Sequence, residues 1–404
     1  MLEYFADYAW NLALGMALDM GANLDEIDRA SRTLRDRGAQ DASDPAKAFF
    51  HAWTDAAVQL VEKAELDRQN GNVLSASEKY RRAAIMYITG ERMPPHDYPP
   101  RIEAYDSLLT CFSRYVSLGG VNCTSVSVPY EGSVLPALFV RALGDGPAPC
   151  MVHFNGLDGL KEFLFLSGFP QALARRGIST LVVDNPGVGE ALRKHDLHNF
   201  AEAERPAGAC VDYLEGRNDV DATRVGMVAL SMGGHHAPRA VAFESRFKCC
   251  VAWGANYDFA SRFRRRVDGV VDPGLAPSVP HLFEHILWVF GAKSIAEALP
   301  IADRFTLEGV LDRIHVPILI THGECDRQIS VEDAYQTYDG CVNSPRRELR
   351  IFTAQEGGEQ HCSIGNMSLA TDFMADWIAD VLGGRAATHA QACQSRLSGH
   401  QKET

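Results

Sequence analysis

The stretch Val225-Gly-Met-Val-Ala-Leu-Ser231-Met-Gly-Gly234 decides the fold of this chain. A β-rich run ends just before Ser231, and a helix-forming segment follows it. The small residues Ala229 and Gly233 lie two positions to either side, as a tight strand-to-helix turn that exposes a serine oxygen requires. The pattern predicts a nucleophilic serine, although Ala229 replaces the first glycine of the usual G-x-S-x-G motif. An ordinary strand-to-helix turn is the alternative that the motif alone leaves open.

A serine hydroxyl becomes a useful nucleophile only beside a histidine base that an acid orients. Asp326 follows the β-branched run 317–321, and His361 follows the run 349–353. Both positions come just after expected strands, where open α/β sheets place their sites. The chain order Ser, Asp, His therefore predicts a catalytic triad of Ser231, Asp326 and His361.

Other acids and histidines compete for these roles. Glu324 is an alternative acid in the same loop, and we interpret His322 as a packed or hydrogen-bonded side chain. His235 and His236 are adjacent on the expected helix, so their side chains point about 100° apart and cannot chelate one metal ion well. We therefore expect no metal and no cofactor.

Hydrolysis through a serine also needs two backbone amides that stabilise the oxyanion. The residue after the nucleophile, Met232, supplies the first. The loop after the run 150–154 supplies the second, and Gly156 permits close approach there, so we expect the amide of Leu157 to be the donor. The glycine-rich segment 184–189 lacks the spacing of a phosphate-binding loop, and we interpret it as a structural turn.

Eight short runs rich in β-branched and apolar residues surround the serine motif. They are residues 121–128, 134–141, 150–154, 179–184, 225–230, 249–253, 317–321 and 349–353. A short turn, Glu131-Gly132-Ser133, separates the first two runs, whereas helix-length segments separate most later ones. The chain therefore predicts an α/β fold, with an antiparallel hairpin leading into a mostly parallel eight-stranded sheet that has helices on both faces.

The regular spacing breaks once, between Trp253 and Pro317, where about 60 residues replace a single crossover helix. We interpret residues 258–305 as an inserted helical lid, and expect Phe283 and Trp288 to contact substrate. The alternative is an insertion that packs only for stability. The insertion also contains a cluster of arginines, Arg262, Arg264, Arg265 and Arg266. We interpret this cluster as a solvated helix face, with attraction of an anionic substrate as the alternative.

The N-terminal part has helical periodicity. Residues 45–91 predict two antiparallel helices around Asn70-Gly71-Asn72, four prolines between residues 91 and 101 predict a linker, and a further helix is expected over 102–118. The apolar opening, residues 1–20, is interpreted as an amphipathic helix. The predicted division is a helical N-terminal domain (1–120), a catalytic domain (121–383) and a disordered tail (384–404).

Composition limits the classes of partner. Of 404 residues, 46% are hydrophobic and 23% are charged, as in globular proteins, and the net charge of 39 − 52 = −13 disfavours nucleic acid. The ten cysteines form no CxxC pair, which suits a reducing cytoplasm, and no apolar run approaches the roughly 18 residues of a membrane span. We expect a cytoplasmic protein that acts on a small molecule and binds no membrane.

Taken together, residues 121–383 resemble the α/β-hydrolase superfamily. The segments NGLDGLKEF, DNPGVGE, ALSMGGHHAPRA and EGGEQHC, with the helical extension, are similar to a subgroup containing fungal heptaketide naphthopyrone hydrolases of pigment biosynthesis and bacterial 2,6-dihydroxypseudooxynicotine hydrolase. The resemblance implies cleavage of a carbon–carbon bond beside a carbonyl in a polyketide-like or aryl ketone, and a homodimer to which the apolar first helix would contribute. It also implies a substrate-handling carboxylate, for which Asp258 is a candidate; Asp158 is another candidate substrate contact.

The triad leaves three hypotheses open, because Ser231 can attack several kinds of carbonyl. The first is a carbon–carbon bond hydrolase, and the second is a carboxylic ester, lactone or thioester hydrolase. The third is a non-hydrolytic use of the fold, such as ring closure or ligand reception. We expect the insertion to decide between them.

Overall fold

The computed structural model describes residues 2–37, 44–270, 272 and 274–384. Within these residues, eight strands form one sheet in the order β1-β2-β4-β3-β5-β6-β7-β8. The strands are β1 (Thr124–Tyr130), β2 (Ser133–Val140), β3 (Ala148–Phe154), β4 (Ser179–Val183), β5 (Val220–Leu230), β6 (Phe247–Trp253), β7 (Ile318–Gly323) and β8 (Arg347–Phe352). β2 pairs antiparallel with β1 and β4, and the remaining pairs are parallel. The predicted fold class, the hairpin and the eight strands are confirmed.

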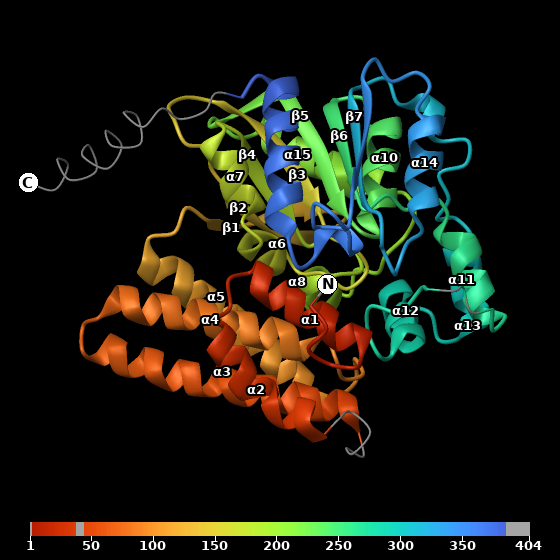
Figure 1. Ribbon diagram of the computed structural model, residues 1–404. Helices are drawn as coiled ribbons and strands as arrows, with labels where there is room; N and C mark the ends of the chain where they lie inside the picture. Colours follow the sequence, from red (N-terminus) through yellow and green to blue (C-terminus); the bar gives the residue numbers. More distant parts are fainter. Residues whose placement is uncertain (1, 38–43, 271, 273, 385–404) are drawn as a thin grey trace, which may run out of the picture.

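Helices cover both faces of the sheet (Figure 1). One face packs against α6 (Lys161–Leu166), α7 (Phe169–Arg175) and α15 (Met367–Leu382). The other face packs against α9 (Glu204–Glu215), α10 (Gly233–Phe243) and α14 (Val331–Gly340). Successive strand residues alternate between the two cores, so Met151 belongs to the first and Val152 to the second.

The N-terminal residues form five helices below the sheet in Figure 1. They are α1 (Tyr8–Asp19), α2 (Leu24–Arg37), α3 (Pro45–Gln69), α4 (Val73–Glu91) and α5 (Pro99–Gly119). Asp44 caps α3 by accepting the amide of Lys47, and Gly71, at φ +78°, reverses the chain before α4. The predicted antiparallel helix pair is confirmed. The proline linker is shorter than predicted, because α5 begins at Pro99 and includes the last two of the four prolines.

Helix α1 differs from its prediction as an amphipathic helix. Every residue from Tyr8 to Ala17 is buried, so the helix has no solvated face. It is enclosed by the neighbouring helices and by the segment after His361, where Ile364 approaches so closely that a Cβ on Gly15 would lie 3.0 Å from it. The apolar side chains of α1 are therefore used within the chain and offer no face for dimerisation. The homodimer itself stays a prediction.

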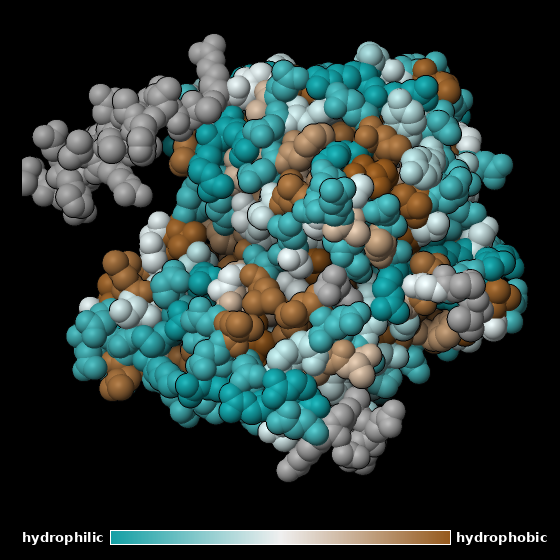
Figure 2. All heavy atoms as spheres, in the orientation of Figure 1, coloured by the Kyte–Doolittle hydropathy of each residue, from teal (hydrophilic) through white to brown (hydrophobic). Residues whose placement is uncertain are grey.

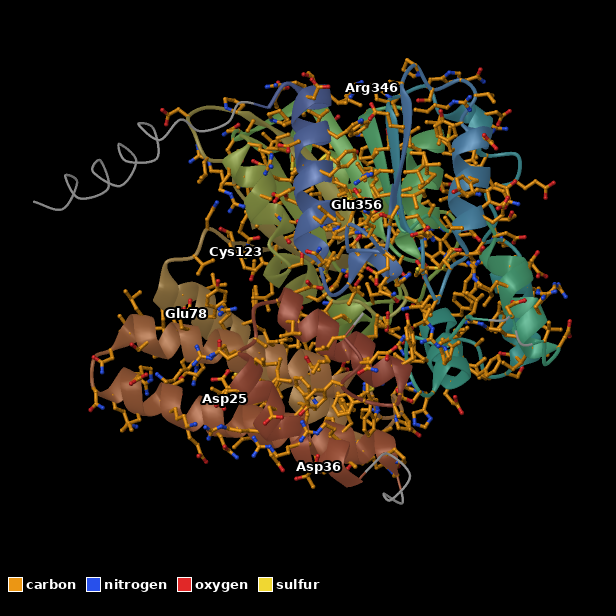
Figure 3. All side chains as sticks on the ribbon, in the orientation of Figure 1. Asp25, Asp36, Glu78, Cys123, Arg346 and Glu356 are labelled. Atoms are coloured by element: carbon orange, nitrogen blue, oxygen red, sulfur yellow. The ribbon has the colours of Figure 1, made fainter. Side chains whose placement is uncertain are left out.

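Charged side chains occupy much of the outer surface of the helical region, although Glu91, Arg92 and Arg101 are buried. Asp25, Asp36 and Glu78 lie on its outer surface in Figure 3, and this side of the region is largely hydrophilic in Figure 2. The buried residues of α1 to α5 belong to the same cluster as one face of the sheet. The predicted boundary at residue 120 coincides with the end of α5, yet the core continues across it. In the described part of the chain, no helix combines the length and apolarity that crossing a membrane requires.

The insertion after β6 is helical, as predicted. It contains α11 (Phe259–Val267), α12 (Leu282–Phe290) and α13 (Ile295–Ala302), which lie beside the N-terminal helices in Figure 1. Phe259, Phe263, Phe290 and Phe305 pack together in a separate core that also includes Leu157 and Met232. In the described part of the chain, the remaining short helices are α8 (Gly189–His195) and the 3₁₀ turns η2 (Leu311–Arg313) and η3 (His361–Ser363). The insertion thus packs directly on the two residues expected to form the oxyanion hole.

Candidate active site

Ser231 occupies a strained turn between β5 and α10. Its φ is +63°, in the left-handed region that non-glycine residues rarely adopt. Its amide donates to the carbonyl of Trp253 at 2.8 Å, which holds the turn against β6. A Cβ on Gly233 would lie 2.6 Å from Cβ of Ala229, so both flanking positions must be small. The predicted geometry around the serine is present, and the ordinary-turn alternative does not account for this strain.

The structure brings the three predicted triad residues together. Ser231 Oγ lies 2.8 Å from His361 Nε2, and His361 Nδ1 lies 2.7 Å from Asp326 Oδ2. Asp326 follows β7 and His361 lies in η3 after β8, so all three are at the carboxyl edge of the sheet. The arrangement allows the Ser231 hydroxyl to donate to His361 while His361 donates to Asp326.

The Asp326 carboxylate has further support. Its Oδ1 accepts the amides of Gln328 and Ile329 at 2.8 and 3.0 Å. His322 is buried beside it, with Nε2 3.0 Å from the carbonyl of Ile329, so it is hydrogen-bonded as predicted. Glu324 is exposed and accepts the amide of Ala354 instead. The geometry therefore favours Asp326 over Glu324 as the acid.

The pKa shifts of the pair follow from burial and mutual attraction. Burial would raise the pKa of Asp326, but the His361 imidazole and its hydrogen bond hold it below the ordinary value. Burial would lower the pKa of His361, but the Asp326 carboxylate raises it well above the ordinary value. The pair thus favours the charged imidazolium that forms when His361 takes a proton from Ser231.

The two expected oxyanion donors are available. Within the described residues, the amides of Leu157 and Met232 have no hydrogen-bond acceptor. A Cβ on Gly156 would lie 2.8 Å from Cβ of Ser231, so glycine is required where this loop passes the nucleophile. Free amides beside a nucleophile are what an oxyanion hole provides.

A histidine that the sequence did not single out holds the Leu157 loop. His285 of α12 is buried, and its Nε2 lies 3.2 Å from the carbonyl oxygen of Leu157. Burial lowers the pKa of His285 to about 4, so the ring is neutral and its Nε2–H donates to that carbonyl. The insertion therefore holds the peptide next to the amide that the sequence predicts as an oxyanion donor.

Ser231 opens into a cavity of about 50 Å³ between the sheet edge and the insertion. It is lined by Leu157, Asp158, Ser231, Met232, Asn256, Phe259, Arg262, Arg266, Ala276, Ser278, Leu282, Gln328 and Ile329. Asp158 is thus at the site, as expected, and its carboxylate pairs with Arg92, which follows α4. Burial would raise the pKa of Asp158, but Arg92 and His285 lower it. The helical N-terminal region therefore supplies a buried cation to the wall of the site.

Three predicted substrate contacts lie elsewhere. Phe283 is 38% exposed and packs against Phe263, while Trp288 stacks on His96 and lies under the guanidinium groups of Arg101 and Arg193. Asp258 caps α11 by accepting the amide of Ser261 and faces a neighbouring cavity. Neither Phe283 nor Trp288 lines the Ser231 cavity, because α12 turns these two rings outward and toward the N-terminal helices. Their contact with substrate stays a prediction. Phe259 is the aromatic residue that lines the Ser231 cavity.

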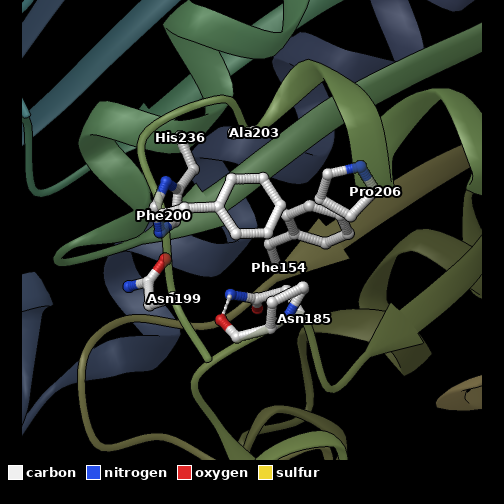
Figure 4. Close-up of a pocket in the computed structure, with 8 residues that line it drawn as sticks. Phe154, Asn185, Asn199, Phe200, Ala203, Pro206 and His236 are labelled. Atoms are coloured by element: carbon white, nitrogen blue, oxygen red, sulfur yellow. Dashed lines mark hydrogen bonds between the residues drawn. The ribbon is translucent and has the colours of Figure 1, made fainter. Parts of the chain in front are cut away.

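Two other cavities adjoin this region. The larger one, about 700 Å³, lies between α11 and the loops after β7 and β8 and shares Arg262 with the Ser231 cavity. The smaller one, about 10 Å³, lies behind α10 and is lined by Phe154, Asn185, Asn199 and His236 among others (Figure 4). It has room for about one water molecule. Among the described residues, no group of three or more His, Cys, Asp or Glu side chains is placed to hold a metal ion.

The fold and the serine turn define a class of protein, and comparison with known families agrees. The profile of the alpha/beta hydrolase family matches residues 151–352, which is half of the 404 residues. The chain belongs to the alpha/beta hydrolase family.

Among individual proteins, the chain is similar to hydrolases of several fungi. It is 26% identical over 381 residues to hydrolase acrC of Aspergillus aculeatus, covering 82% of this chain and 88% of that protein. It is 26% identical over 413 residues to the 20-hydroxy-prefusarin hydrolase FUS2 of Gibberella moniliformis, covering 93% and 96%. The crystal structure of 2,6-dihydroxy-pseudo-oxynicotine hydrolase superimposes with a TM-score of 0.73 at 22% identity, covering 93% of this chain and 97% of that one. This fold likeness extends over the N-terminal helices as well as the sheet, and the predicted resemblance is confirmed.

Proposed function

We propose that this chain is a serine hydrolase that cleaves a carbon–carbon bond next to a carbonyl in a polyketide-like or aryl ketone of secondary metabolism. Ser231 is the nucleophile, His361 the general base and acid, and Asp326 the residue that orients the imidazole. The observation that carries the proposal is the hydrogen-bonded sequence Ser231–His361–Asp326 beside two free amides. The similarity to the 20-hydroxy-prefusarin hydrolase supports the substrate class.

The reaction begins when Ser231 Oγ attacks the carbonyl carbon and its proton passes to His361 Nε2. The oxygen of the tetrahedral intermediate accepts hydrogen bonds from the amides of Leu157 and Met232. The bond to the leaving carbon then breaks, and the electron pair leaves as an enolate that takes the proton from His361. Water next gives a proton to His361 Nε2 while its oxygen attacks the acyl carbon. The bond from that carbon to Ser231 Oγ then breaks, and Ser231 Oγ takes the proton back from His361, which releases the acid and free Ser231.

The lining of the site restricts the leaving group. Among the described residues that line the cavity, Asp158 is the only carboxylic acid, and its lowered pKa keeps it ionised, so it is a poor proton donor. A single histidine must then protonate the leaving group, which favours a carbanion already stabilised as an enolate or phenolate. A β-diketone or an acylated phenol ring meets that requirement.

Ester, lactone or thioester hydrolysis is the second candidate. Since the described lining offers no second proton donor beside His361, leaving groups of low basicity are favoured here too, and an aryl oxide or thiolate needs no more help than an enolate. The two candidates share every residue of the triad, so substrates and not triad variants must separate them.

The experiment compares aryl esters with β-diketones and naphthopyrone-type ketones, using the full chain and its Ser231→Ala variant. We expect ketone cleavage with a higher kcat/KM than aryl ester cleavage, and loss of both in Ser231→Ala by roughly 10⁴-fold or more. A fluorophosphonate should label Ser231 and leave the variant unlabelled. Ester turnover without ketone turnover would select the second candidate, and activity or labelling that persists in Ser231→Ala would reject the assigned nucleophile.

A further inference from the structure

The four arginines of α11 separate into two groups in the structure. Arg264 pairs with Asp303 and Arg265 with Asp272, and both side chains are more than half exposed. These two form the solvated face that the sequence suggests. Arg262 and Arg266 line the Ser231 cavity, whereas Arg264 and Arg265 do not.

The spacing of the residues places them on one face of the helix. Phe259, Arg262 and Arg266 are three and four residues apart, so their side chains project from the same face of α11. That face forms one wall of the cavity that contains Ser231 Oγ. A substrate whose carbonyl lies at Ser231 must therefore pass close to this wall.

Arg262 has a partner within the protein. Its Nη1 lies 3.2 Å from Asp333 Oδ1, and its Nη2 donates to Asn256. Asp333 also accepts the amide of Tyr257, so this group ties the start of the insertion to α14. Arg262 is thus neutralised and structural.

Arg266 differs from the other three because it has no acceptor among the residues that the structure describes. It is half-buried, and burial together with the neighbouring Arg262 lowers its pKa. The nearby acids already have cations, since Asp272 pairs with Arg265 and Asp158 with Arg92. A partly desolvated guanidinium without a counter-ion is costly, and a ligand anion would remove that cost.

We propose that Arg266 is a specificity-determining residue that binds a carboxylate on the acyl side of the substrate. The proposal rests on the proposed function, in which Ser231 is the nucleophile. Ser231 and Arg266 line the same cavity, so one substrate can contact both. A guanidinium binds a carboxylate through two parallel hydrogen bonds, so the contact fixes the substrate's orientation as well as its charge. The substrate class is then an anionic keto acid or acid ester.

The test uses 4-nitrophenyl monoesters of succinate, glutarate and adipate, each paired with the uncharged analogue whose terminal carboxylate is a carboxamide. For one chain length at least, we expect the acid to have a KM about tenfold or more below that of its amide. Arg266→Met should remove this preference by raising the KM of the acid while leaving kcat within about twofold, because the contact is made equally in ground and transition states. Arg264→Met, which removes the same charge from the solvated face, should keep the preference.

Binding to the Ser231→Ala protein, measured by calorimetry with the same ester pairs, separates this proposal from the proposed function. Tighter binding of the acid that disappears on adding Arg266→Met supports the carboxylate site even if the unmodified chain turns over neither ester. Turnover of both esters with equal KM and equal binding at every chain length would overturn the carboxylate site and leave the hydrolase assignment standing. An acid preference that survives Arg266→Met would also overturn it.

Discussion

The guanidinium of Arg92 pairs with the carboxylate of Asp158, which links the end of α4 to the loop that carries an oxyanion donor. Arg92 is 6% exposed, and its Nε and Nη1 have no other partner among the described residues. Asp158 directly follows Leu157, so a displacement of this carboxylate moves the adjacent amide. The N-terminal helices therefore take part in the geometry of the site.

Removing one partner of this buried pair should be costly. We expect Arg92→Met to lower the free energy of unfolding by about 3 kcal/mol, because it leaves the Asp158 charge buried and uncompensated. The double variant with Asp158→Asn should lose less than the sum of the two single losses. Urea unfolding measures the free energy of unfolding of each variant. Lys194→Met, which breaks the exposed pair with Asp106, is the control and should cost under about 1 kcal/mol. Additive losses would show that the two residues do not act together.

The choice between the two candidate acids can be tested by paired variants. We expect Asp326→Asn to lower kcat/KM roughly a thousandfold or more, because an amide cannot hold the His361 tautomer that accepts the Ser231 proton. Glu324→Gln should change kcat/KM by less than about twofold, since Glu324 is exposed and bonds only the amide of Ala354. Equal losses in the two variants would contradict the triad that the structure assembles.

The activity should fall on the acid side of the pH profile. His361 must be neutral to accept the Ser231 proton, so kcat/KM decreases as the pH drops through the His361 pKa, which Asp326 raises well above its ordinary value. In Asp326→Asn, burial still lowers the pKa of His361, but no carboxylate raises it, so the pKa of His361 falls. The residual activity of that variant should therefore persist to lower pH. A pH–rate profile of kcat/KM checks this, and an unchanged or upward-shifted acid limb would argue against the coupling.

Stability should depend on pH through Asp19, which accepts the amides of Gly365 and Met367 at the end of α1. Burial raises its pKa to about 6 in the folded protein, against about 4 in an unfolded chain. The folded state thus holds a proton that the unfolded state releases, and the stability contributed by protonated Asp19 is lost as the pH rises through 6.

Asp19→Asn cannot lose that proton. We therefore expect the stability of the variant relative to the unmodified chain to increase between pH 5 and pH 7 and then to level off, as measured by urea unfolding. The control is Asp25→Asn, which removes an exposed carboxylate paired with Arg29. The stability of this variant relative to the unmodified chain should not vary over this pH range. A difference for Asp19→Asn that is equally flat would show that its carboxyl group is not perturbed.

The parts of this protein that the sequence predicts are those encoded locally. The strand runs, the small residues around Ser231 and the chain order of the triad each come from neighbouring residues or from a fixed topology, and the structure contains all of them. The burial of α1 could not be predicted from neighbouring residues, because Ile364, which packs against Gly15, is far away in the chain. The same holds for His285, whose partner Leu157 lies 128 residues away in the chain.

The arginines of α11 show which feature of the site the sequence does not predict. Helical spacing alone does not divide these arginines, because Arg262 is three residues from Arg265 and four from Arg266 and so shares a face with both. Which of them lacks a counter-ion depends on acids from α14 and from the end of α13, and no local pattern reveals those contacts. The sequence therefore leaves a solvated face and an anion site as alternatives, and the fold separates them.

The last prediction concerns α12, whose His285 contacts the predicted oxyanion loop. Its neutral ring donates to the carbonyl of Leu157 and so holds the peptide beside a predicted oxyanion donor. We expect His285→Leu to lower kcat about tenfold on ketone and ester substrates alike, since both form the same oxyanion, while KM changes little because that contact develops in the transition state. Phe283→Ala on the same helix is the matched control. Phe283 is 38% exposed and lies outside the Ser231 cavity, so its loss should leave kcat and KM within about twofold. If His285→Leu raises KM for one substrate class only, α12 selects substrates directly. If Phe283→Ala changes KM, Phe283 contacts substrate, as the sequence predicts.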